Sequence, residues 1–117
     1  MRVAAAMVVL GSGVAVMAAP ITEARAFMGR CLLQVDHRAY LNGPCNIEML
    51  GEGSFSIGTG ENRSRYFAYV LVDRATGRAS GSWNGPSAAS HAHEELGELT
   101  RQGACWVNAR ARVCAVR

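Results

Sequence analysis

The segment 90–95, Ser-His-Ala-His-Glu-Glu, holds the side chains of this chain that are best suited to chemistry. Imidazole and carboxylate groups bind zinc and act as general acids and bases, so His91, His93 and Glu95 are the candidate residues of a small metal-dependent hydrolase. On the helix expected here, positions two apart point about 200 degrees away from each other. His91 and His93 then cannot hold one ion, and the pair His91 and Glu95 lacks a third ligand. We therefore expect a solvated helix start, with no metal or other cofactor.

Nucleophilic catalysis has no matching motif. Gly81-Ser82-Trp83-Asn84-Gly85 places its serine one position too early for a Gly-x-Ser-x-Gly elbow. The sequence also lacks a Cys-x-x-Cys pair of the kind that redox enzymes use. These observations favour a protein that is not an enzyme.

All the basic side chains other than histidine are arginines, which favour bidentate pairing with carboxylates and other anions. Arg110 and Arg112 lie at the tip of an expected hairpin, a geometry suited to probing an acidic cleft such as a hydrolase site. Arg63 and Arg65 lie next to the aromatic residues Tyr66, Phe67 and Tyr69, a combination typical of stacking surfaces and of interface hot spots. The formal net charge of +3 does not favour nucleic acid as a partner.

Residues 1–26 have the three parts of a cleavable secretory signal: Arg2, an apolar run over 3–19, and the small-residue exit Ala24-Arg25-Ala26. The run is shorter than the roughly 20 apolar residues that cross a bilayer, and two glycines interrupt it. We expect cleavage before Phe27, no transmembrane anchor in the mature chain, and a periplasmic or secreted monomer formed by one domain, 27–117.

The four cysteines all lie after this segment, and an even number in a short exported chain predicts two disulfides. Cys31–Cys45 would close the base of a first hairpin. Cys105–Cys114 would lie opposite each other in a last hairpin, whose sequence is symmetrical about positions 109 and 110. Other connectivities, such as Cys45 to Cys105, stay open.

The chain between the cysteines is mostly of β type. We expect strands at 31–35, 39–41, 46–50, 54–59, 66–72, 78–83, 105–108 and 111–114, with a break at Asn42-Gly43-Pro44. From 87 to 102 the period changes, because Ala89, Ala92, Leu96 and Leu99 share one helical face, although Gly97 weakens a helix there. The expected fold is mainly β: a small antiparallel barrel or sandwich of about seven strands with one short helix.

Four stretches resemble small exported bacterial proteins, a family known to us only as uncharacterised: Tyr40-Leu41-Asn42-Gly43-Pro44-Cys45, Tyr66-Phe67-Ala68-Tyr69-Val70, Ser82-Trp83-Asn84-Gly85 and the block 91–114. The resemblance implies a periplasmic or secreted location and carries over no catalytic residue. In size, export and β content the chain is also similar to the periplasmic lysozyme inhibitors. Their Ser-Gly-x-x-Tyr loop motif is missing, because Ser80-Gly81 is followed by Ser82-Trp83-Asn84.

Together these features favour an exported, non-enzymatic binding or inhibitor module of the bacterial envelope, which recognises a protein or envelope ligand through rigid disulfide hairpins. The alternative is a structural envelope protein that contacts peptidoglycan or the outer membrane. The metal-dependent hydrolase is the third and least favoured function.

Overall fold

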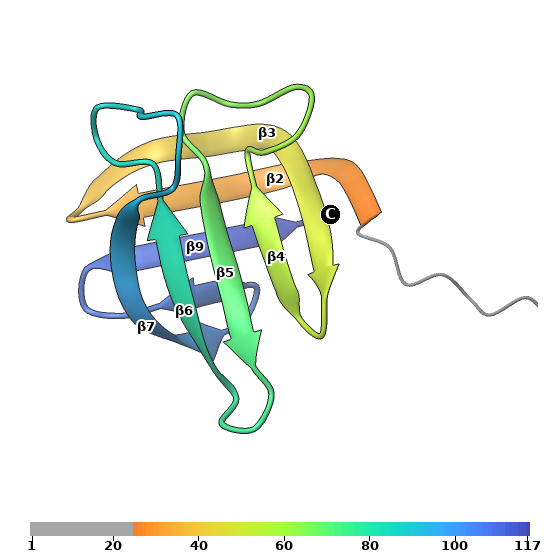
Figure 1. Cartoon of the computed structure of the whole chain (residues 1–117), viewed down its shortest axis with the longest axis vertical. Helices are drawn as coiled ribbons and strands as arrows, with labels where there is room; N and C mark the ends of the chain where they lie inside the picture. Colours follow the sequence, from red (N-terminus) through yellow and green to blue (C-terminus); the bar gives the residue numbers. More distant parts are fainter. Residues whose placement is uncertain (1–24) are drawn as a thin grey trace, which may run out of the picture.

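The computed structural model describes residues 25–117, so the expected signal peptide lies outside the described residues except for Arg25 and Ala26. The described part contains eight strands and no helix (Figure 1). They are β2 (Arg25–Val35), β3 (Arg38–Gly51), β4 (Ser54–Ile57), β5 (Ala68–Asp73), β6 (Arg78–Trp83), β7 (Glu94–Gln102), β8 (Cys105–Val107) and β9 (Ala111–Val116).

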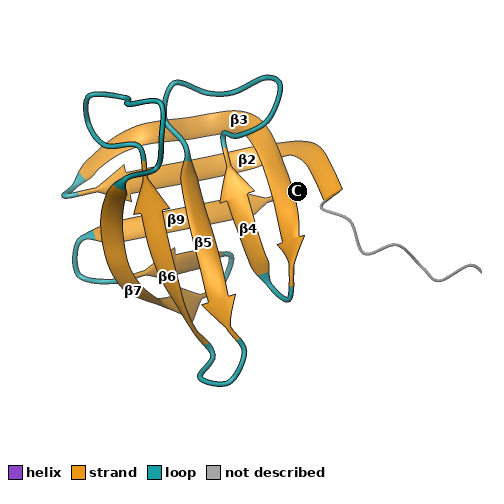
Figure 2. Ribbon diagram, viewed as in Figure 1, coloured by secondary structure: helices purple, strands orange, loops and turns teal. Residues whose placement is uncertain are grey.

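Each strand pairs antiparallel with the next, and β9 returns to β2, so the sheet closes into a barrel (Figure 2). In the view of Figure 1, β4 to β7 run steeply across the front, while β2, β3 and β9 cross behind them. The long strand β3 joins the two groups: it pairs with β2 over most of its length and with β4 only from Ile47 onward.

Inward-facing and outward-facing side chains alternate along the strands, and the inward-facing ones form the core. Fully buried side chains from five strands, Leu33, Ile47, Val70, Leu99 and Val113, meet inside the barrel, as expected for an eight-stranded barrel whose interior is filled by side chains. In β5, for example, Ala68 and Val70 are buried, whereas Leu71 is 52% exposed.

Successive turns of such a meander alternate between the two ends of the barrel. We call one end the loop end; it carries the connections 36–37, 58–67, 84–93 and 108–110. The other, which we call the mouth, carries the short turns 52–53, 74–77 and 103–104. The two long loops both lie at the loop end (Figure 2).

The helix expected over 87–102 is not formed. Residues 84–93 are loop, and Glu94–Gln102 is strand β7. Gly81 pairs with Gly97 and Ser82 pairs with Glu95, so Leu96 is an extra residue in β7, beside Gly97 at φ +89°. Such a bulge shifts the inward positions by one residue, so the buried leucines Leu96 and Leu99 are three apart, a spacing that imitates a helix.

The break expected at Asn42-Gly43-Pro44 is also wrong, because β3 runs through it. Pro44 lies opposite Arg30 of β2, in a part of β3 that no strand of the described residues pairs with on the other side. A proline is tolerated there because no ladder hydrogen bond is required from it on the open side. The barrel therefore has eight strands in the described residues where about seven were expected, with β7 in place of the helix.

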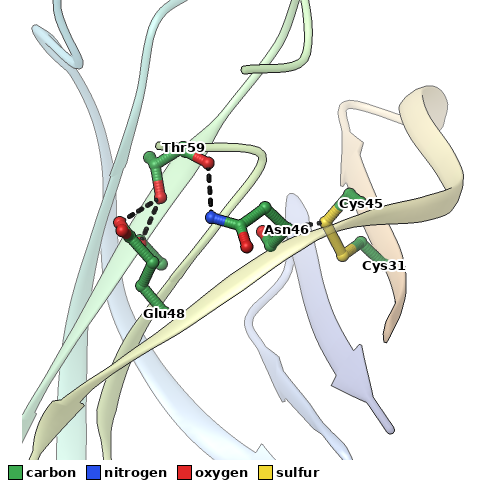
Figure 3. The surroundings of a disulfide bond; sticks show 6 residues. Cys31, Cys45, Asn46, Glu48 and Thr59 are labelled. Atoms are coloured by element: carbon green, nitrogen blue, oxygen red, sulfur yellow. Dashed lines mark hydrogen bonds between the residues drawn. A yellow bond between two sulfur atoms is a disulfide. The ribbon is translucent and has the colours of Figure 1, made fainter. Parts of the chain in front are cut away.

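Both expected disulfides are present. Cys105 and Cys114 lie directly opposite each other in β8 and β9. Cys31 and Cys45 join β2 and β3 diagonally, since Cys31 pairs with Gly43 and Cys45 with Gly29 (Figure 3). Two disulfides in a small domain are typical of proteins from an oxidising compartment.

Candidate functional site

Arg110, a candidate at the hairpin tip, is hydrogen-bonded to other residues of the same chain. Its guanidinium donates two hydrogen bonds to Asp36, at 3.2 and 3.1 Å, and one to the backbone oxygen of Glu95 at 3.2 Å. The hydrogen bond from Arg110 holds the pKa of the Asp36 carboxyl below its usual range. Arg110 therefore ties the β8–β9 turn to the β2–β3 turn and to the start of β7.

Arg112 donates a hydrogen bond to the side-chain oxygen of Gln102 at 3.0 Å. Arg110 and Arg112 do line one hollow, together with Gln34 and His37, but its volume is only about 170 Å³. Pockets for small ligands usually have at least about 300 Å³. The hairpin tip is thus held in place by hydrogen bonds within the chain, and the hollow beside it is small for a ligand site.

The histidine cluster is not arranged around a common point. His93 Nδ1 lies 3.1 Å from the backbone oxygen of His91, and its Nε2 lies 3.6 Å from a carboxylate oxygen of Glu94. His91, His93 and Glu95 are all exposed. Among residues 25–117, no three His, Cys, Asp or Glu side chains come together in a group that could hold a metal ion.

The loop end carries a continuous stack of arginine and tyrosine side chains, which we call the platform: Arg38, Tyr40, Tyr66 and Arg65. The Arg38 guanidinium carbon lies 5.1 Å from the centre of the Tyr40 ring, and that of Arg65 lies 5.5 Å from the Tyr66 ring. The two tyrosine rings are 5.0 Å apart, edge to face. Both also contact Trp83, with ring centres at 4.6 and 6.3 Å. An aromatic floor thus supports two guanidinium groups at distances typical of cation–π contacts.

Three separate parts of the chain build this platform. Arg38 and Tyr40 lie at the start of β3, Arg65 and Tyr66 at the end of the β4–β5 loop, and Trp83 at the end of β6. Trp83 is 2% exposed, so it closes the barrel beneath the tyrosines. Its indole Nε1 is buried and has no hydrogen-bond acceptor among the described residues, which indicates that packing holds this ring in place.

Asn84 holds the two long loops together beside the platform. Its fully buried side chain accepts a hydrogen bond from the Phe67 amide at 3.0 Å and donates to the backbone oxygens of Arg65 at 2.9 Å and Ala89 at 3.0 Å. It therefore fixes the backbone on both sides of Tyr66. The Tyr66 hydroxyl in turn donates to the backbone oxygen of Pro86, at 3.2 Å.

A second polar network anchors the other end of the β4–β5 loop, next to the Cys31–Cys45 disulfide (Figure 3). The Asn46 side chain donates to the Thr59 backbone oxygen, and the Thr59 hydroxyl donates to Glu48, both at 2.7 Å. Buried Ser56 joins this network, with its hydroxyl 2.6 Å from that of Thr59. The loop that carries Arg63 and Arg65 is therefore pinned at both ends.

The arginines of this loop and of β3 have no acidic partners in the described barrel. Ion pairs form at Arg78–Glu98 and Arg110–Asp36, whereas Arg38, Arg63 and Arg65 have no carboxylate within 4.0 Å among residues 25–117. Arg63 lies over the Phe67 ring, at 5.2 Å. Three exposed guanidinium groups therefore each lie over an aromatic ring and form no ion pair among the described residues.

Sequence reasoning identified Arg63 and Arg65 as candidates but not Arg38, Tyr40, Trp83 or Asn84. The signal for Asn84 is Asn84-Gly85-Pro86, which directly follows the expected strand 78–83. An asparagine before a Gly-Pro pair also suits a role in holding a loop, because its side chain bonds readily to nearby backbone.

Comparison with protein-family models, curated proteins and solved structures gives no match for this chain. Among the described residues, there is no helix with the length and apolar character needed to cross a membrane.

Proposed function

We propose that this protein is a non-enzymatic binding module, exported to the periplasm or secreted, and that its platform recognises an acidic surface of a partner protein. The observation that carries the proposal is the Arg38–Tyr40–Tyr66–Arg65 stack, which presents two guanidinium groups without acidic partners in the described residues. Tyrosine and arginine are the residue types most enriched, with tryptophan, where binding energy concentrates in protein interfaces.

The rigidity of the platform favours tight recognition. Binding costs free energy for every side chain that must be ordered, at about 0.5–1.5 kcal/mol each. Here the tyrosine rings are half-buried against Trp83, and Asn84 fixes the adjacent backbone, so much of that ordering precedes binding. The platform lies across the end of the barrel, above a buried Trp83, an arrangement that suits the surface of a macromolecule.

The sharper form of the proposal is inhibition of an enzyme whose cleft is acidic. Glycoside hydrolases flank the scissile bond with a pair of carboxyl groups, and two guanidinium groups on one surface complement such a pair in charge, since a guanidinium binds a carboxylate in bidentate fashion. The similarity in size and β content to the periplasmic lysozyme inhibitors points in the same direction.

Affinity capture from envelope extract tests the proposal. The baits are the wild-type chain, the charge-reversed platform variant R38E/R65E, and the control R30E/R74E, which makes the same charge change at two exposed arginines outside the platform. We expect one discrete protein on the wild-type and control baits, and its loss from R38E/R65E and from reduced, alkylated bait. Equal capture by R38E/R65E would contradict the proposal.

Two further readouts separate the alternatives. Added to a lysozyme assay, the wild-type chain should reduce the rate of cell-wall lysis, and R38E/R65E should not. If all three baits instead retain peptidoglycan or outer-membrane material and no protein, the structural envelope role replaces the binding role.

A further inference from the structure

The mouth of the barrel, opposite the platform, is hollow and lined by apolar side chains. A cavity of about 280 Å³ lies among ten residues, nine of them in six strands and two turns, with Arg117 just after β9. Its apolar wall includes Phe27, Met49, Phe55 and Trp106, of which Phe55 and Trp106 are buried. Barrel mouths are among the common places for small-molecule sites, and the volume of this cavity is close to the lower limit of such sites, about 300 Å³.

Two exposed arginines, Arg101 and Arg117, line this cavity. Arg101 lies directly opposite Trp106 in the β7–β8 pairing and so shares its inward face. Arg117 directly follows β9, whose Ala115 also lines the cavity. The other eight residues that line the cavity are uncharged, so the charge of the lining comes from these two guanidinium groups.

Neither arginine has an acidic partner among residues 25–117. The Arg117 guanidinium carbon lies 4.2 Å from the centre of the Phe27 ring, and Arg101 Nε donates to the backbone oxygen of Gly103 at 3.1 Å. The ion pairs within the described barrel involve neither residue. Most of the donor groups of both guanidiniums therefore remain available to an anion, which they bind in bidentate fashion.

We propose that the mouth binds a free, single-chain anionic amphiphile, an alkyl carboxylate, with its head between Arg101 and Arg117 and its tail against Phe55 and Trp106. The volume of about 280 Å³ limits the tail, since at about 30 Å³ per water-sized group it holds about nine such groups. This site lies at the opposite end from the platform, and the proposal stands independently of the proposed function.

A chain-length series measures the fit. The purified exported chain is titrated calorimetrically with hexanoate, octanoate, decanoate and dodecanoate, each below the concentration at which it aggregates. Each added methylene should tighten binding about fourfold until the cavity is filled, after which the affinity levels off near octanoate to decanoate. A rise that continues unbroken to dodecanoate would show adsorption to the surface and overturn the proposal.

The requirement for charge is tested with variants. R101Q/R117Q should weaken octanoate binding at least about tenfold, whereas R74Q, at an exposed arginine in the β5–β6 turn, should leave it unchanged. A104W, at an exposed position of the cavity rim, should block binding while keeping the circular dichroism of the fold. Wild-type affinity in both R101Q/R117Q and A104W would overturn the site.

The ligand class has its own controls. Octyltrimethylammonium has the same tail and the opposite charge, and should not bind. Vesicles of anionic phospholipid should not co-sediment with the protein, because the cavity holds one short chain. Binding to vesicles without binding to the free carboxylates would overturn the proposal in favour of a membrane surface.

Discussion

Asn84 is the residue whose removal should most directly loosen the loop end. Its buried amide makes three hydrogen bonds, to Phe67, Arg65 and Ala89. A hydrogen bond contributes about 1 kcal/mol net, and a buried group left without a partner costs about 1–3 kcal/mol. Since Phe67 is 4% exposed, its amide has no ready replacement. We therefore expect N84A to lower the free energy of unfolding by about 3 to 4 kcal/mol, a large part of the roughly 5–15 kcal/mol of a typical domain.

The assay is equilibrium unfolding in urea, followed by tryptophan fluorescence, with thermal unfolding by circular dichroism beside it. For a domain of this size the loss corresponds to a fall in Tm of roughly 15 to 25 °C. The matched control is N42A, at an exposed asparagine of β3, which should stay within about 0.5 kcal/mol of the wild type. If N84A also stays within that margin, the assignment of Asn84 as the brace of both loops is wrong.

Three other predictions concern the disulfides, the turn ion pair and export. Replacing Cys105 and Cys114 by serine should lower the free energy of unfolding by about 2.5 to 3 kcal/mol in the chain-entropy model. Urea unfolding measures this loss, and an unchanged unfolding midpoint would refute the prediction. In R110Q, carboxyl NMR titration should show the pKa of Asp36 back near 3.8. In the wild type the folded-state pKa of Asp36 is depressed, so the Asp36–Arg110 pair stabilises the fold at pH values above the unfolded-state pKa. This contribution is lost as the pH falls through the folded-state pKa. The exported protein should begin at Phe27 by mass spectrometry, whereas an intact 1–26 segment would refute the predicted cleavage.

The last hairpin shows how far local sequence can specify a structure. Cys105 pairs with Cys114, Trp106 with Val113 and Val107 with Arg112, the register expected from the symmetry about 109 and 110. A tight turn fixes the register of a hairpin without help from the rest of the fold. The same local rule gave the β5–β6 hairpin, with its turn at 74–77.

The helix error has an equally local cause. In a regular strand the inward-facing residues are two positions apart, and one bulge residue makes that spacing three at a single place. Gly97, which weakened the expected helix, is the residue that takes the positive φ beside the bulge. A glycine that interrupts a helical pattern is therefore also a signal for a bulged strand.

The platform could not be predicted from local sequence patterns. Tyr40 and Trp83 are 43 positions apart, and only closure of the barrel brings them together with Tyr66. The sequence identified arginines and aromatics as a recognition pattern, but which of them meet depends on strand order. Arg110 shows the converse, because a residue that we expected to contact a partner binds Asp36 of the same chain.

Site-specific photocrosslinking in the producing cells tests the central claim, recognition through the platform, most directly. A photoreactive phenylalanine analogue replaces Arg65 on the platform in one strain and Arg74, in the β5–β6 turn at the opposite end, in another. We predict a discrete crosslinked protein from position 65 and none from position 74. The same crosslinked protein from position 74, or crosslinks from position 74 alone, would contradict recognition through the platform.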